Sequence, residues 1–133
     1  MKNDLKANWQ PTELLETAFG VASWAHRDDV RKGTSIPYLS HLLAVSALVI
    51  ENGGTEVQAA AALLHDVIED TEIDEFMFRA LIDRQVVDIV VACSDALSRP
   101  KPSWRPRKEK YLNHLREMIA EPEPNPAILV ALA

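Results

Sequence analysis

The feature that most constrains this chain is an apolar segment that runs directly into ionisable side chains. Residues 59–64 are four alanines and two leucines, and His65 and Asp66 follow them without a break. A helix that is apolar on every side is normally buried, whereas a buried charge is costly unless it is paired or binds a metal. The polar end of this helix therefore either faces water or carries chemistry.

The acidic residues that follow repeat at helical spacing. Glu69 lies four residues after His65 and three after Asp66, and Asp70 lies four after Asp66. Residues three and four apart share one face of a helix. One helix continuing through this stretch would place all four ionisable groups at a single small site.

The composition is that of a chain able to form one globular domain. It has 133 residues, 47% hydrophobic and 26% charged, which is enough for a real core. The formal net charge of −6 argues against a general nucleic-acid or membrane-surface binder, because such proteins present a basic surface. The single cysteine provides no disulfide framework, and no apolar run approaches the roughly 20 residues of a membrane span. We therefore expect a cytoplasmic protein without a nucleic-acid or membrane partner.

Periodicity and end signals predict helices along the whole chain. Gly53 and Gly54 mark the end of one helix, and Thr55 with Gln58 forms a capping box for the central one. No segment alternates in the manner of a strand, so the predicted fold is an all-α, compact multi-helix domain. The predicted helices cover about 12–26, 39–51, 56–68, 74–81, 86–97 and 107–119, with a last helix from residue 126.

Two stretches near the C-terminus interrupt or end this pattern. A basic, proline-broken segment over 99–107 is predicted to be a solvated surface loop. Residues 127–133 form an unbroken apolar run with no capping residue. We expect residues 1–133 to be the N-terminal and central part of one domain, truncated after Ala133 and lacking its C-terminal helices.

Three side chains are candidate metal ligands: His41, His65 and Asp66. Imidazole nitrogen and carboxylate oxygen suit a borderline divalent ion, but the separation of the two histidines requires two neighbouring helices to bring them together. Each histidine also has a simpler interpretation, with His41 as a half-buried core residue or cap and His65 as a donor to a nearby carbonyl. The residues alone leave both interpretations open.

Several motifs resemble the HD-domain metal-dependent phosphohydrolases. The stretch Leu64-His65-Asp66-Val67-Ile68-Glu69-Asp70-Thr71 is similar to the motif that names the family. The block Arg31-Lys32-Gly33, followed by Pro37-Tyr38-Leu39-Ser40-His41, resembles the branch that hydrolyses the alarmones (p)ppGpp, which includes the small alarmone hydrolases. The resemblance continues through Ser94-Asp95 and residues 101–109, and it covers most of the chain from about Leu14.

The resemblance implies a hydrolase with a bound metal. His41, His65 and Asp66 match three ligands of a mononuclear site that usually holds Mn²⁺. Glu69 and Asp70 match the acidic pair that orients or deprotonates the attacking water. The family's fourth ligand is an aspartate directly after a stretch like 129–133, so it would be the residue after the end of this chain.

The resemblance also implies a small-molecule nucleotide substrate. Arg31 and Lys32 match residues that contact the nucleotide, with Arg31 placed to stack on a base. Without the resemblance, a charged turn before Gly33 explains these two residues equally well. Ser94 and Asp95 match positions that line the pocket. The alternatives are another HD phosphohydrolase, such as a 5′-nucleotidase or a phosphatase of a phosphorylated cofactor, and a non-catalytic nucleotide-binding module.

Overall fold

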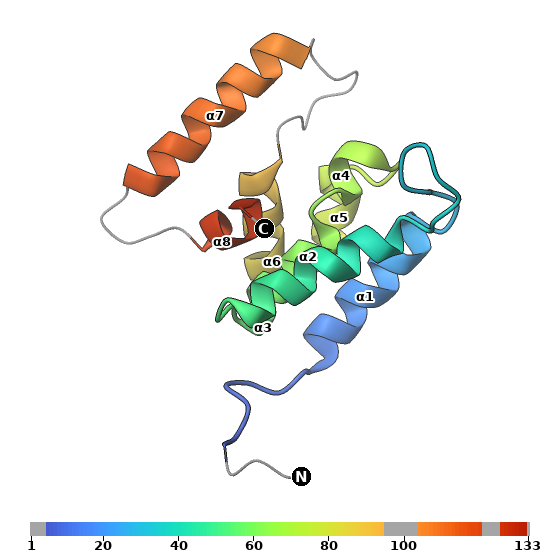
Figure 1. The fold of residues 1–133 in the computed structure, drawn as a ribbon, viewed down its shortest axis with the longest axis vertical. Coiled ribbons are helices and arrows are strands. Elements are labelled where there is room, and N and C mark those ends of the chain that lie inside the picture. The colour runs from blue at the N-terminus through green and yellow to red at the C-terminus, as the bar shows by residue number, and fades with distance from the viewer. Residues whose placement is uncertain (1–4, 95–103, 121–125, 133) are drawn as a thin grey trace.

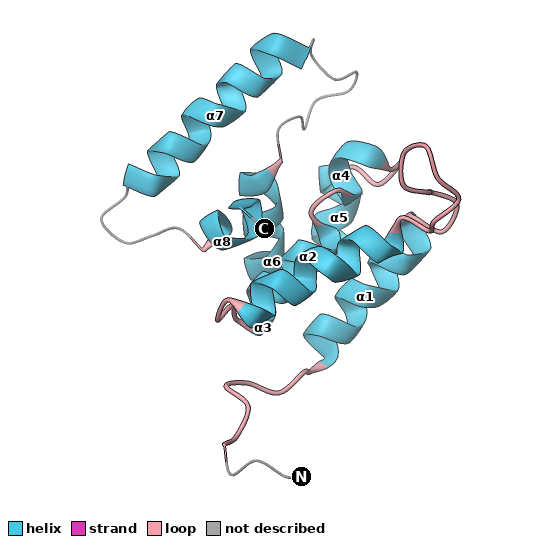
Figure 2. Cartoon of the chain, viewed as in Figure 1, coloured by secondary structure: helices cyan, strands magenta, loops and turns pink. Residues whose placement is uncertain are grey.

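A computed structural model describes residues 5–94, 104–120 and 126–132, and every regular element in these ranges is a helix (Figures 1 and 2). The all-α prediction is therefore confirmed. None of the helices in these ranges has the length and apolar character needed to cross a bilayer. The helices are α1 (Glu13–Ala25), α2 (Leu39–Glu51), α3 (Glu56–Leu64), α4 (Val67–Asp70), α5 (Glu75–Leu81), α6 (Arg84–Cys93), α7 (Trp104–Ala120) and α8 (Ala127–Leu132).

The centre of the fold is α3, which packs against α1, α2, α6 and α8. All six residues of 59–64 are buried, none more than 3% exposed. The predicted capping box is present: Gln58 N–H donates to the Thr55 hydroxyl at 3.2 Å, and Thr55 N–H donates to the Gln58 side chain at 2.9 Å. The hydroxyl of Ser46 on α2 donates to the Ala59 carbonyl at 3.0 Å. The packing and capping of α3 thus fix the position of the residues that follow it.

The predicted glycine stop after α2 is also confirmed. Gly53 has φ of +86°, a left-handed conformation that favours glycine. A Cβ on Gly54 would lie only 2.5 Å from Val49 Cγ1, so this position has no room for a side chain. The chain therefore turns back sharply after α2, and α2 and α3 pack against each other.

The prediction of one central helix reaching residue 68 was wrong, because α3 ends at Leu64 and the separate turn α4 follows. In a continuing helix the Ala62 carbonyl would accept the N–H of Asp66. The His65 side chain takes that carbonyl instead, with Nδ1 at 2.6 Å from the oxygen. The helix ends where the imidazole of His65 competes with the backbone N–H of Asp66 for this carbonyl. His65 and Asp66 form the junction between α3 and α4.

Two other predicted boundaries differ near the C-terminus. Helix α7 begins at Trp104 rather than near 107; Pro106 lies in its first turn, where backbone N–H groups have no helical partner to lose. Of the predicted loop over 99–107, residues 99–103 therefore lie outside the described residues and the remainder belongs to α7. Helix α6 ends at Cys93, and residues 95–97 of its predicted extent also lie outside the described residues.

Candidate metal centre

Three predicted ligands come together at one end of the helix bundle. His41 lies in the first turn of α2, while His65 and Asp66 form the junction between α3 and α4. One potential ligand atom from each residue lies within 4.8 Å of the other two. Oδ2 of Asp66 is 3.0 Å from Nε2 of His65 and 3.9 Å from Nε2 of His41. Two separate helices thus deliver an imidazole each to the same carboxylate.

A hydrogen bond fixes the orientation of the His65 ring. The carbonyl of Ala62 can only accept, so Nδ1 of His65 carries a proton and donates it. Nε2 then faces Asp66. An imidazole held through one nitrogen by a backbone carbonyl presents the other nitrogen to a metal.

The charges in the cluster suit a cation. Burial and the charge of His65 lower the pKa of His41, so its ring is neutral near pH 7. Burial opposes ionisation of Asp66, but the hydrogen bond and charge of His65 outweigh it and lower the carboxyl pKa. Burial would lower the pKa of His65, yet its hydrogen bond to Asp66 and the charge of that carboxylate raise it overall. The cluster therefore favours positive charge beside Asp66, which a bound cation would supply.

Glu69 and Asp70 adjoin this group on α4. Carboxylate oxygens of Asp66, Glu69 and Asp70 all lie within 4.8 Å of one another, so Asp66 belongs to both clusters. Asp70 is exposed and Glu69 is half-buried. Of the four residues predicted to line one site, His65 falls in one group and Glu69 and Asp70 in the other, with Asp66 shared, on a junction and a separate helical turn rather than along one continuous helix.

A tight loop presents Arg31 and Lys32 on the surface beside the cluster. Val30 and Pro37 pair as an isolated bridge, Arg31 N–H donates to the Ile36 carbonyl at 2.9 Å, and Gly33 has φ of +75°. Both cationic residues are exposed. The pKa of His41 is lowered mainly by burial and by the charge of His65, and to a smaller extent by the charge of Arg31. The guanidinium of Arg31 therefore lies within electrostatic reach of His41.

The other two predicted site residues follow α6. The hydroxyl of Ser94 donates to the Val90 carbonyl at 3.0 Å, and Asp95 lies outside the described residues. The preceding residue, Cys93, shows which way this end of α6 faces. Burial, and then the negative charge of Glu69, raise the pKa of the Cys93 thiol to about 12. The Cys93 thiol at the end of α6 therefore lies within electrostatic reach of Glu69.

Tyr38 belongs to the cluster, but sequence reasoning gave it no role. Its hydroxyl donates a hydrogen bond to Oδ2 of Asp66, and its ring centroid lies 5.3 Å from that of His41. Burial and the bond to Asp66 raise the pKa of Tyr38, which keeps the hydroxyl protonated as a donor. The available signal was its position three residues before His41, about one helical turn from a candidate ligand.

The family model of the HD domain matches residues 18–133. This chain belongs to the HD domain family. HD domains bind divalent metals, and among the described residues both the group His41, His65 and Asp66 and the group Asp66, Glu69 and Asp70 could hold such an ion.

Curated relatives of this HD domain carry names from alarmone metabolism. A probable guanosine-3′,5′-bis(diphosphate) 3′-pyrophosphohydrolase of Synechocystis is 38% identical over 60% of the chain. The bifunctional (p)ppGpp synthase/hydrolase SpoT of Escherichia coli K12 is 33% identical over 79% of it. A GTP pyrophosphokinase of Streptomyces coelicolor is 40% identical over 53%. The matched segments span only 10%, 14% and 8% of these three relatives, respectively.

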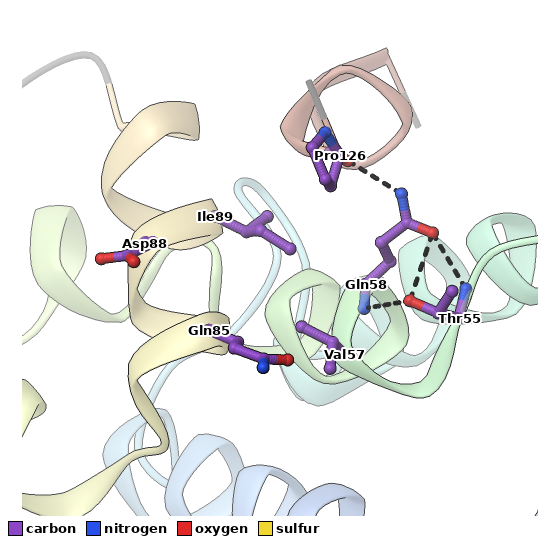
Figure 3. Close-up of a pocket in the computed structure, with 7 residues that line it drawn as sticks. All are labelled: Thr55, Val57, Gln58, Gln85, Asp88, Ile89 and Pro126. Carbon is purple, nitrogen blue, oxygen red and sulfur yellow. Dashed lines mark hydrogen bonds between the residues drawn. The ribbon is translucent and has the colours of Figure 1, made fainter. Parts of the chain in front are cut away.

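A cavity of about 550 Å³ lies elsewhere in the HD domain, between the start of α3, α6 and the residue before α8 (Figure 3). Its lining residues at the start of α3 lie about 10–15 Å from His65 along the helix axis, at the helical rise per residue. Its carboxylate, Asp88, is engaged by Arg79 at 3.5 Å and Arg84 at 3.9 Å. None of the predicted site residues that the structure describes lines this cavity, whose described lining is Thr55, Val57, Gln58, Gln85, Asp88, Ile89 and Pro126.

Proposed function

We propose that this HD domain is a metal-dependent phosphohydrolase that cleaves a nucleotide pyrophosphate such as (p)ppGpp. The observation that carries the proposal is the convergence of His41, His65 and Asp66, from two helices, beside the carboxylates of Glu69 and Asp70. The names of the relatives support the substrate class. The proposed metal is Mn²⁺, which accepts imidazole and carboxylate ligands together.

The proposed division of labour follows from the chemistry of each group. His41, His65 and Asp66 would hold a divalent metal, which when bound would make a water molecule more acidic and polarise a phosphoryl oxygen. Glu69 and Asp70 lie beside Asp66 and are suited to orient the attacking water and accept its proton. His41, neutral because its pKa is lowered by burial and by His65, is available as a ligand near pH 7.

Substrate binding is assigned to the loop beside the cluster and to the end of α6. The chain carries a net charge of −6, so a polyanionic substrate needs local positive charge to approach. Arg31 and Lys32 provide it, and the planar guanidinium of Arg31 suits stacking on a base. Ser94 and Asp95 are proposed to line the remaining part of the nucleotide pocket.

The products distinguish this function from the alternatives. With Mn²⁺, the purified protein is expected to convert ppGpp to GDP and release pyrophosphate. Release of inorganic phosphate instead would indicate a phosphatase or nucleotidase. Binding of ppGpp by a protein that elemental analysis finds free of metal, with no turnover on added Mn²⁺, would indicate a nucleotide-binding module. The GTP pyrophosphokinase name of one relative is tested separately by supplying GTP and ATP.

Arg31→Ala is expected to raise KM for ppGpp by about 5- to 30-fold while leaving kcat nearly unchanged. A stacked guanidinium contributes roughly 1–2 kcal/mol of binding that the ground state and the transition state share. Steady-state kinetics at saturating Mn²⁺ measure both constants. Arg27→Ala is a matched control, because that guanidinium lies 4.5 Å from the Trp24 ring centroid. Equal effects of the two substitutions would refute the role of Arg31.

A further inference from the structure

Tyr38 makes a direct contact with the carboxylate that the two imidazoles share. Its hydroxyl donates to Oδ2 of Asp66, the same oxygen that lies 3.0 Å from Nε2 of His65 and 3.9 Å from Nε2 of His41. The side chain of Asp66 is only 14% exposed, so water has little access to compete for this oxygen. The tyrosine hydroxyl is therefore, with the imidazole of His65, one of the two groups that orient the carboxylate.

The tyrosine itself is held rigidly. Its ring lies between two imidazoles, with centroids 5.0 Å from His26 and 5.3 Å from His41. His26 is only 3% exposed, and its Nδ1 is 2.9 Å from Oδ2 of Asp29. The backbone carbonyl of Asp29 accepts the N–H of Tyr38 at 2.9 Å. The ring of Tyr38 thus packs on the buried His26, and its backbone is held by the partly exposed Asp29, to which His26 is paired.

We propose that Tyr38 is a positioning residue, which orients Asp66 for metal binding through its hydroxyl. This inference rests on the proposed metal-dependent function. Groups that hydrogen-bond a metal ligand fix its direction, and their loss typically costs 10- to 100-fold in metal affinity. A carboxylate oxygen can accept more than one partner, so the bond from Tyr38 leaves capacity for a cation.

The same residue links the metal centre to the substrate loop. Tyr38 closes the base of the loop through Asp29, and that loop carries Arg31 and Lys32. Tyr38 therefore connects the Asp66 carboxylate to the loop that carries the cationic residues proposed to bind substrate. The His26–Asp29 pair acts through Tyr38 and does not itself belong to the ligand group.

Tyr38→Phe is expected to raise the Kd for Mn²⁺ by about 10- to 100-fold. The substitution removes only the hydroxyl and keeps the ring between its two imidazole neighbours, so the helical circular dichroism spectrum should not change. Isothermal titration with Mn²⁺ measures the affinity, and the visible absorption of the Co²⁺-loaded protein should shift because the carboxylate is reoriented. Tyr111→Phe is the matched control, since Tyr111 lies on α7, which is drawn apart from α2 and α4 (Figure 1), and this variant should bind Mn²⁺ like wild type.

The outcomes separate this inference from the proposed function. Wild-type Mn²⁺ affinity and an unchanged Co²⁺ spectrum in Tyr38→Phe, in a protein that does bind metal, would overturn the role of Tyr38 alone. A wild-type protein that takes up no Mn²⁺ would overturn the proposed function. In that case, the contact between Tyr38 and Asp66 is tested in the metal-free protein. The losses in melting temperature of Tyr38→Phe and Asp66→Asn are compared with the loss in the double variant. Non-additive losses support the orienting contact, and additive losses overturn it.

Discussion

Asp66→Ala is expected to abolish Mn²⁺ binding and ppGpp hydrolysis together. Asp66 belongs both to the group with His41 and His65 and to the group with Glu69 and Asp70. Its removal leaves two neighbouring imidazoles without the anion that offsets a cation beside them. Loss of a ligand should cost more than loss of a group that orients one, so we expect the Kd for Mn²⁺ to rise by more than about 100-fold. Turnover should fall to background, because no metal is left to activate water.

The fold should survive this substitution, so that the loss can be attributed to the site. The core surrounds α3, whose residues 59–64 are buried, and Asp66 lies beyond its end. Asp28→Ala is the matched control, because the Asp28 side chain is 88% exposed and its only ion-pair contact in the described structure is Arg27, at 3.8 Å. Elemental analysis, Mn²⁺ titration and product analysis are compared across wild type and the two variants. Hydrolysis by Asp66→Ala protein that holds no metal would refute the proposed mechanism.

Local signals predicted the helices well where the end of the helix is encoded nearby. Helix α2 ends where predicted because two glycines follow it, one with φ of +86° and one with no room for a Cβ. The capping box of Thr55 and Gln58 likewise fixes the start of α3. The end of α3 could not be predicted in this way, because it depends on the His65 side chain taking the Ala62 carbonyl. Helical spacing gives no indication of that competition.

The site was predicted in part for a similar reason. The sequence shows that His65 and Asp66 are adjacent and that Glu69 and Asp70 follow, which are local facts. It does not show that α2 brings His41 to the same point, since that depends on how α2 packs on α3; the resemblance to a family supplied that step. The role of Tyr38 depends on a hydrogen bond across 28 residues and on burial beside His26. Neither can be read from the order of the residues.

Asp70→Asn is expected to retain Mn²⁺ but to lower kcat by about 10²- to 10⁴-fold. The asparagine keeps the shape of the side chain and loses the ability to accept a proton from water, which is the contribution expected of a general base. Asp70 is exposed on α4, and its carboxylate lies near that of Asp66. The three proposed ligands His41, His65 and Asp66 are unchanged, so metal affinity should stay within a few-fold of wild type. Single-turnover kinetics with ppGpp, alongside Mn²⁺ titration, measure the two effects separately.

Asp66 and Asp70 are neighbouring carboxylates with different proposed roles, so their substitutions should have different effects. Asp66→Ala should remove metal and activity together, whereas Asp70→Asn should separate them. Glu72→Gln is the matched control, as an exposed acidic residue just beyond α4, and it should change neither quantity. If Asp70→Asn loses Mn²⁺ as completely as Asp66→Ala does, Asp70 is a ligand and the water must be activated by another group. Unchanged kcat with full metal occupancy would leave Glu69 as the remaining candidate for the base.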